Sequence, residues 1–166
     1  NILQSEYMEI SFSYLCMKPD EANIHVWTDA SGANRLGFGA YNSLGQCFQI
    51  KWKDINLNYV RNTKDSSFTE FLAMVTAAFH WRKEFYGKTI HFHCDNSATV
   101  GFVLTRSTPK NRPDLLNLAR WLTVVALRFR FYFWITHIPG ILNIEGDRLS
   151  RFKKNPFGRL FSQANG

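Results

Sequence analysis

The sequence contains little cysteine and no hydrophobic run long enough to cross a membrane. Its three cysteines, Cys16, Cys47 and Cys94, lie far apart and form no Cys-x-x-Cys motif. They predict buried thiols in a reducing, intracellular compartment (cytoplasm or nucleus) rather than a disulfide framework or a cysteine-based zinc site. A spanning helix needs about 20 consecutive apolar residues. No such run occurs here, so we expect no membrane partner.

The start of the chain also lacks the basic and apolar segments of a signal peptide. It begins at Asn1 without Met, which is typical of a processed piece of a longer protein. Hydrophobic residues make up 45% of the 166 positions and aromatic residues 16%, which excludes a disordered, collagen-like or low-complexity chain. This length predicts one domain.

Acidic residues are scarce relative to basic ones, which leaves a net charge of +7. The excess of positive charge lies mainly in the C-terminal half of the sequence. It favours a polyanionic partner such as nucleic acid. The alternative explanation of the same net charge is a solvated basic surface that binds no such partner.

Hydrophobic periodicity predicts an alternation of strands and helices. The spacing becomes helical from Ser67, with Ser66 or Ser67 as the N-cap and Gly87 as the stop. Expected strands are 24–28, 36–42, 46–52, 89–94 and 131–136, and expected helices are 67–86, 96–105, 113–128 and 144–152. This order predicts an α/β domain with a mixed sheet. We expect a linker or docking segment (1–22), the domain (23–152) and a basic tail (153–166).

Four carboxylates occupy unusual places in this pattern. Asp29 and Asp95 each end a predicted strand, Glu70 stands among apolar helix residues, and Asp147 lies in the first turn of the last helix. Each has an ordinary explanation as a cap or a first-turn acid. If they converge, their repulsion requires divalent cations, and carboxylates select Mg²⁺ or Mn²⁺. We see no Cys/His cluster for zinc, and we interpret His25, His80, His91 and His93 as structural or surface residues.

Five motifs in chain order carry a resemblance to a known family. They are Trp27-Thr28-Asp29-Ala30-Ser31, Gly37-Phe38-Gly39-Ala40, Thr69-Glu70-Phe71-Leu72-Ala73, Cys94-Asp95-Asn96-Ser97-Ala98, and His137-Ile138-Pro139-Gly140 followed by Asn143 and Gly146-Asp147-Arg148-Leu149-Ser150-Arg151. The set closely resembles the ribonuclease H domain of retroelement reverse transcriptases, particularly those of LTR, DIRS-like and Ty3-like retrotransposons. The resemblance covers about residues 24–152.

The resemblance implies a ribonuclease H-like fold, with a five-stranded mixed sheet whose first three strands are antiparallel and helices on both faces. It also implies hydrolysis of the RNA strand of RNA–DNA hybrids by two Mg²⁺ ions, with Mn²⁺ as a substitute. The ligands would be Asp29, which bridges both ions, with Glu70, Asp95 and Asp147. His137 matches a loop histidine that assists product release or proton transfer, although a structural role at the end of the strand is the alternative.

The substrate contacts implied by the family are less specific than the carboxylates. Ser67 replaces the more usual Asn or Gln, and the basic helical handle of cellular enzymes is replaced by the short loop 106–112. We therefore expect the polymerase and connection domains of the same polyprotein to help hold the hybrid. Candidate contacts are Ala30, Ser31, Gly32, Ser67, Asn96, Arg106, Lys110, Arg112, Asn143, Arg148 and Arg151.

Two other functions compete with this one. A hybrid-binding or scaffold domain with weak or absent catalysis would keep the same fold. Another nuclease or strand-transfer enzyme of the superfold, such as an integrase, usually has a three-acid set that ends in a helical Glu and lacks the final motif. Tests of cleavage on hybrid, double-stranded DNA and double-stranded RNA separate the three.

Overall fold

The computed structural model describes residues 22–31, 36–55, 65–105 and 107–152. Almost all of the expected linker (1–22), the expected tail (153–166), Cys16, Gly32 and Arg106 therefore lie outside the described residues.

A five-stranded mixed sheet forms the centre of the fold, in the order β3-β2-β1-β4-β5. Its first three strands pair antiparallel, whereas β4 pairs parallel with both β1 and β5. The strands are β1 (Ile24–Ala30), β2 (Gly37–Asn42), β3 (Cys47–Lys51), β4 (Thr89–Cys94) and β5 (Tyr132–His137). The predicted fold class and the antiparallel arrangement of the first three strands are confirmed.

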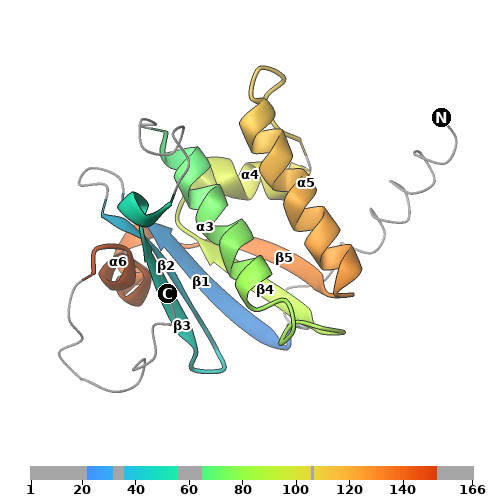
Figure 1. Cartoon of the computed structure of the whole chain (residues 1–166), viewed down its shortest axis with the longest axis horizontal. Helices are drawn as coiled ribbons and strands as arrows, with labels where there is room; N and C mark the ends of the chain where they lie inside the picture. Colours follow the sequence, from blue (N-terminus) through green and yellow to red (C-terminus); the bar gives the residue numbers. More distant parts are fainter. Residues whose placement is uncertain (1–21, 32–35, 56–64, 106, 153–166) are drawn as a thin grey trace, which may run out of the picture.

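Helices cover both faces of this sheet (Figure 1). On one face α3 packs against β1, β2 and α5, while α4 contacts β4 and β5. On the other face α6 contacts β1 and β2. The helices are α3 (Ser66–His80), α4 (Ser97–Thr105), α5 (Pro113–Arg128) and α6 (Ile144–Ser150), with short 3₁₀ helices η2 (Trp52–Asp54) and η3 (Gly140–Leu142).

The main core lies between the sheet and the helices α3, α4 and α5. Aromatic side chains fill much of it, which explains the high aromatic content of the sequence. The rings of Phe38 and Phe48 meet edge to face at 6.2 Å, and Phe48 lies 5.3 Å from Trp81. The largest fully buried side chains include Phe38, Phe48, Phe71, Phe85, Phe92 and Phe131.

The ends of α3 differ from the prediction. Asp65, rather than Ser66 or Ser67, caps the helix, because its carboxylate accepts the N–H groups of Ser67 at 2.9 Å and Phe68 at 3.4 Å. The helix ends at His80, and residues 81–87 continue as turns that bury Trp81. Hydrophobic periodicity cannot distinguish such turns from a helix, since both place apolar residues at similar intervals on the side that faces the core.

The cysteines and the hydrophobicity of the helices can be compared with the expectations from the sequence. Cys47 and Cys94 are buried, as predicted. Among the described helices, none is both long enough and apolar enough to cross a membrane.

Close contact between α6 and the sheet depends on a glycine in β2. A Cβ atom on Gly39 would lie 2.7 Å from Cβ of Leu149 in α6 and 3.0 Å from the carbonyl oxygen of Phe48. Gly39 is also the register partner of Asp29 on β1. The missing side chain therefore lets α6, which carries Asp147, approach β1 and β2 closely.

We predict that Gly39→Ala lowers the melting temperature, because overpacking a tight contact costs about 1–3 kcal/mol. In a protein of this size each kcal/mol corresponds to about 2–4 °C. Gly101→Ala in α4 is the matched control, since its added Cβ meets no atom within 4 Å and the helix gains from Ala. Thermal unfolding followed by circular dichroism measures both. A Gly39→Ala protein as stable as the wild type would contradict the packing argument.

Candidate active site

Asp29 and Asp95 lie next to each other because β1 and β4 run parallel. Trp27 pairs with His93 in the register, so the residues two positions further along each strand are Asp29 and Asp95. The two carboxyl groups share a hydrogen bond. Asp29 lies within β1 and is 6% exposed, whereas Asp95 follows β4 and is half-buried. This is the carboxyl end of two parallel strands, where α/β folds commonly bind ligands.

Glu70 reaches the same place from α3. Its Oε1 accepts the N–H of Ala30 at 3.2 Å, and the side chain is buried. Its Oε2 is also buried and has no hydrogen-bond partner among the described residues. Burial, followed by the charges of Asp29 and Asp95, raises the pKa of Glu70 well above its usual 4.5. A buried oxygen in this state is a position where a cation would be stabilised.

The helix α6 contributes the fourth carboxylate and Ser150, and Arg151, which follows the helix, also contacts the site. Asp147 lies in its first turn, and its Oδ1 accepts a hydrogen bond from Nε of Arg151 at 2.6 Å. The Ser150 hydroxyl donates to Oδ2 of Asp29 at 2.6 Å. Asp147 is close enough to raise the pKa of Asp29 and of Asp95. Asp29 and Asp95 therefore interact electrostatically with both Glu70 and Asp147 at one end of the sheet.

Electrostatic repulsion and burial both disfavour the charged forms. Burial is the main reason that the pKa of Asp29 rises from 3.8 to about 6, and Asp95 and Asp147 add to the rise. The hydrogen bond from Ser150 opposes it. Burial likewise raises the pKa of Asp95, while its hydrogen bond to Asp29 and the nearby His137 oppose the rise. Bound cations would reverse this preference for the protonated forms.

The donor atoms suit a hard divalent ion. Single ligand atoms of Glu70, Cys94 and Asp95 lie within 4.8 Å of one another. Burial raises the pKa of the Cys94 thiol, so this group stays protonated and is a poor ligand. The carboxylate oxygens remain, and these favour Mg²⁺ or Mn²⁺ over zinc.

His137, the last residue of β5, and the loop after it bring further sequence-predicted residues to this end of the sheet. Nε2 of His137 lies 3.2 Å from the carbonyl oxygen of Asp95, and the histidine is exposed. Gly140 approaches the same aspartate, since a Cβ there would lie 3.2 Å from Oδ2 of Asp95. Asn143 is 1% exposed and donates from Nδ2 to the carbonyl oxygen of Thr28 at 2.9 Å. Its side chain connects this loop to β1.

Several of the candidate substrate contacts already form hydrogen bonds within the protein. The Ser31 hydroxyl donates to the Gly37 carbonyl oxygen at 2.8 Å and accepts the Gly37 N–H at 2.9 Å. Asn96 caps α4 by accepting the N–H of Thr99 at 2.8 Å. The carbonyl oxygen of Ser67 accepts the Thr99 hydroxyl at 3.3 Å. These bonds fix the segments that border the carboxylates.

Among the candidate substrate contacts that the structure describes, the basic residues are three arginines and Lys110. Arg112 pairs with Asp65 and Asp114, Arg148 pairs with Glu145, and Arg151 pairs with Asp147. Lys110 is an exposed residue of the short loop. The arginines therefore have acidic partners that a phosphate would need to replace.

Ser150 is the site residue that the sequence reasoning missed. It stands three positions after Asp147, which places both on one side of a helix. It also belongs to the final motif, so helical spacing could have identified it. Its bond to Asp29 required knowledge that α6 packs against β1.

The raised pKa of Asp29 predicts how stability depends on pH without divalent ions. The native state holds its proton more tightly than the unfolded chain, so Asp29 destabilises the fold as pH rises from about 4 to about 6. The free energy of unfolding of Asp29→Asn should therefore increase relative to wild type across this window. The gain is a few kcal/mol at most, since one pKa unit corresponds to about 1.4 kcal/mol. Urea unfolding in EDTA measures the difference, and a difference that shrinks with rising pH would contradict the assignment.

Comparisons with solved structures identify the fold. The chain is similar to LC11-RNase H1, isolated from compost and solved in complex with an RNA/DNA hybrid, with 14% identity over 79% of this chain and 96% of that one and a TM-score of 0.59. It is also similar to the N-terminal RNase H domain of rv2228c from Mycobacterium tuberculosis, with 17% identity over 80% of this chain and 98% of that one and a TM-score of 0.54. A third similar structure is RNase H1 from the archaeon Halobacterium salinarum, with 19% identity over 76% of this chain and 92% of that one and a TM-score of 0.52. No protein-family model and no curated protein matches the sequence. The chain therefore has the ribonuclease H fold.

Proposed function

We propose that this protein hydrolyses the RNA strand of RNA–DNA hybrids, as the ribonuclease H domain of a retroelement reverse transcriptase. The observation that carries the proposal is the meeting of carboxylates from β1, α3, the end of β4 and α6 at one end of the sheet. Structural neighbours with this fold include an RNase H1 bound to an RNA/DNA hybrid, which supports the substrate class.

The cations required are two Mg²⁺ ions, for which Mn²⁺ can substitute. Asp29, Glu70, Asp95 and Asp147 would hold them. The partnerless Oε2 of Glu70 and the mutual repulsion of the carboxylates support this assignment. When bound, the ions would supply activation of a water molecule and stabilisation of the leaving 3′-oxygen.

The chain's own side chains would hold the carboxylate oxygens in place for this chemistry. Ser150 fixes Oδ2 of Asp29, and the N–H of Ala30 fixes Oε1 of Glu70. Arg151 compensates the charge of Asp147 and would be displaced by a cation bound there. His137 is exposed beside Asp95, where it could accept or donate a proton during product release.

The hybrid would lie across this end of the sheet. Contacts to 2′-hydroxyls would come from Ala30, Ser31, Gly32, Ser67 and Asn96. The loop residues Arg106, Lys110 and Arg112, together with Asn143, Arg148 and Arg151, would contact or position the phosphate backbone. Because three of these arginines already form ion pairs, phosphate binding must compete with them, and we expect weak hybrid affinity that falls with salt.

The domain would comprise residues 23–152. We propose residues 1–22 as a docking segment, with residues 153–166 as a basic tail. The polymerase and connection domains of the parent polyprotein would hold the rest of the substrate, since the described part of the chain has only the short loop after α4 in place of a basic handle.

We predict that Asp29→Asn abolishes cleavage of the RNA strand while the fold is retained. Removal of one electrostatic stabiliser of a transition state costs about 10²–10³-fold in rate, and loss of a shared ligand should cost at least as much. Asp54→Asn is the control, because Asp54 is an exposed aspartate in η2 outside the site. Single-turnover cleavage of a labelled hybrid with Mg²⁺ measures the rates, and circular dichroism checks the fold.

Parallel reactions on double-stranded DNA and double-stranded RNA test the substrate. Selective cutting of the hybrid supports the proposal. Hybrid binding without cleavage by the wild-type protein would indicate the scaffold alternative. Equal cutting of DNA would indicate another nuclease of the superfold, and near-native cleavage by Asp29→Asn would remove Asp29 from the mechanism.

A further inference from the structure

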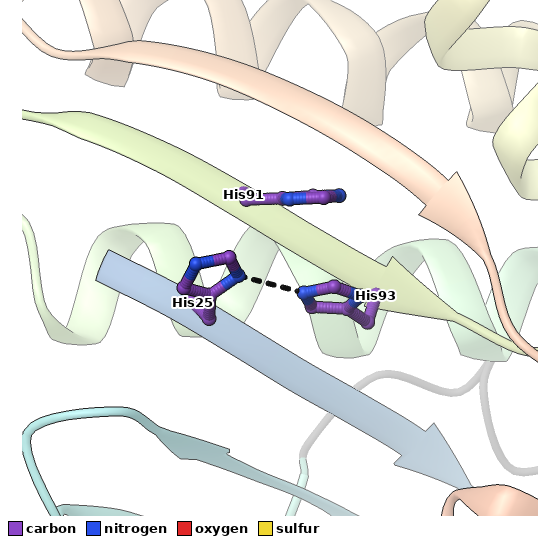
Figure 2. A group of neighbouring side chains, drawn as sticks. All are labelled: His25, His91 and His93. Atoms are coloured by element: carbon purple, nitrogen blue, oxygen red, sulfur yellow. Dashed lines mark hydrogen bonds between the residues drawn. The ribbon is translucent and has the colours of Figure 1, made fainter. Parts of the chain in front are cut away.

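Three histidines gather on the face of the sheet opposite the main core (Figure 2). His25 comes from β1, and His91 and His93 alternate along β4. In the register His25 pairs with His91, while His93 pairs with Trp27 on the same face. His25 and His93 are half-buried and His91 is buried. A His-x-His strand and one histidine on the neighbouring strand thus bring three imidazoles together, with the rings of His91 and His93 stacked at 4.1 Å.

The nitrogen atoms of these rings are close enough for one ion. Nδ1 of His25 lies 3.0 Å from Nε2 of His93, and one ligand atom from each histidine lies within 4.8 Å of the others. Two nitrogens on a tetrahedral zinc ion, each at about 2.0–2.1 Å, lie about 3.3–3.4 Å apart. The His25–His93 pair therefore needs only a small separation. A metal ion would replace the hydrogen bond between these two nitrogens.

Neighbouring side chains orient the imidazoles. The Thr136 hydroxyl from β5 lies 2.8 Å from Nε2 of His91 and 3.4 Å from Nδ1 of His93. The Trp27 ring stacks on His93 at 4.8 Å with an angle of 10°. Metal-binding histidines are commonly held in this way, with the second ring nitrogen bonded to an oxygen. In His93 this arrangement directs Nδ1 to Thr136 and Nε2 to His25.

The donor type of the cluster also suits a transition-metal ion, since all three side chains offer imidazole nitrogen. Neutral imidazole favours zinc, copper and nickel ions over Mg²⁺.

We propose that His25, His91 and His93 bind one Zn²⁺ ion through three imidazole nitrogens, with the fourth position open to water. Such a site would join β1 to β4. Its ligands differ from those of the carboxylate site, which begins with Asp95 two residues beyond His93, about 7 Å along the strand, so the proposal does not depend on the proposed function. The cluster is not apparent in the sequence, because 68 positions separate His25 from His93 and only the strand register brings them together.

Calorimetric titration of the chain with Zn²⁺, in excess Mg²⁺ to occupy the carboxylates, tests this site. We expect one Zn²⁺ per chain, and we expect His25→Gln and His93→Gln to weaken binding by at least about tenfold, as perturbed metal sites usually show. His80→Gln is the matched control, since His80 lies on α3 outside the cluster. Zn²⁺ should also raise the melting temperature of the wild type and of His80→Gln but not of the cluster variants.

A second measurement on the wild-type protein avoids any folding defect of the variants. Imidazole NMR signals of His25, His91 and His93 should shift together on Zn²⁺ addition, and those of His80 should not. Absence of Zn²⁺ binding would overturn the proposal. So would imidazole signals that do not move, or binding that survives His25→Gln and disappears in Asp95→Asn.

Discussion

The parallel pairing of β1 with β4 is the constraint on which both sites depend. This register places Asp29 beside Asp95 at one end of the strands and His25 beside His91 further back. The two strands are separated by more than fifty residues of chain, so neither site exists before the sheet forms. The antiparallel strands β2 and β3 extend the same sheet, and the glycine at position 39 allows α6 to pack close to it.

At the carboxylate end of the sheet, the environment disfavours the charged forms of the carboxyl groups. Burial and repulsion raise the pKa values of Asp29, Glu70 and Asp95, while Ser150 and the Ala30 N–H stabilise two of the charged groups. These two hydrogen bonds do not offset the repulsion and burial of the carboxylates, since the pKa values remain raised. A purely structural cluster would gain stability if one carboxylate were lost, so the arrangement is best understood as a place prepared for cations.

The sequence predicted much of this fold because its periodicity is clear. The bounds of α5 match the prediction, since Pro113 marks its start, and each expected strand appears within a few residues of its expected place. Motif order identified the carboxylates on their elements. Contacts between distant segments could not be predicted in the same way: the bond from Ser150 to Asp29, the buried amide of Asn143 and the histidine cluster all depend on strand register and helix packing. The cap at Asp65 was missed because three polar residues in a row compete for that place.

The most direct test of the account is whether the carboxylate end binds Mg²⁺. Calorimetric titration of the wild-type chain with Mg²⁺, compared with Glu70→Gln, addresses the group that has a buried partnerless oxygen. The account predicts Mg²⁺ binding to the wild type, accompanied by a higher melting temperature, and a large loss of both in Glu70→Gln although the glutamine keeps an oxygen for the Ala30 N–H. Equal Mg²⁺ affinity in the two proteins, or no binding to the wild type, would contradict it.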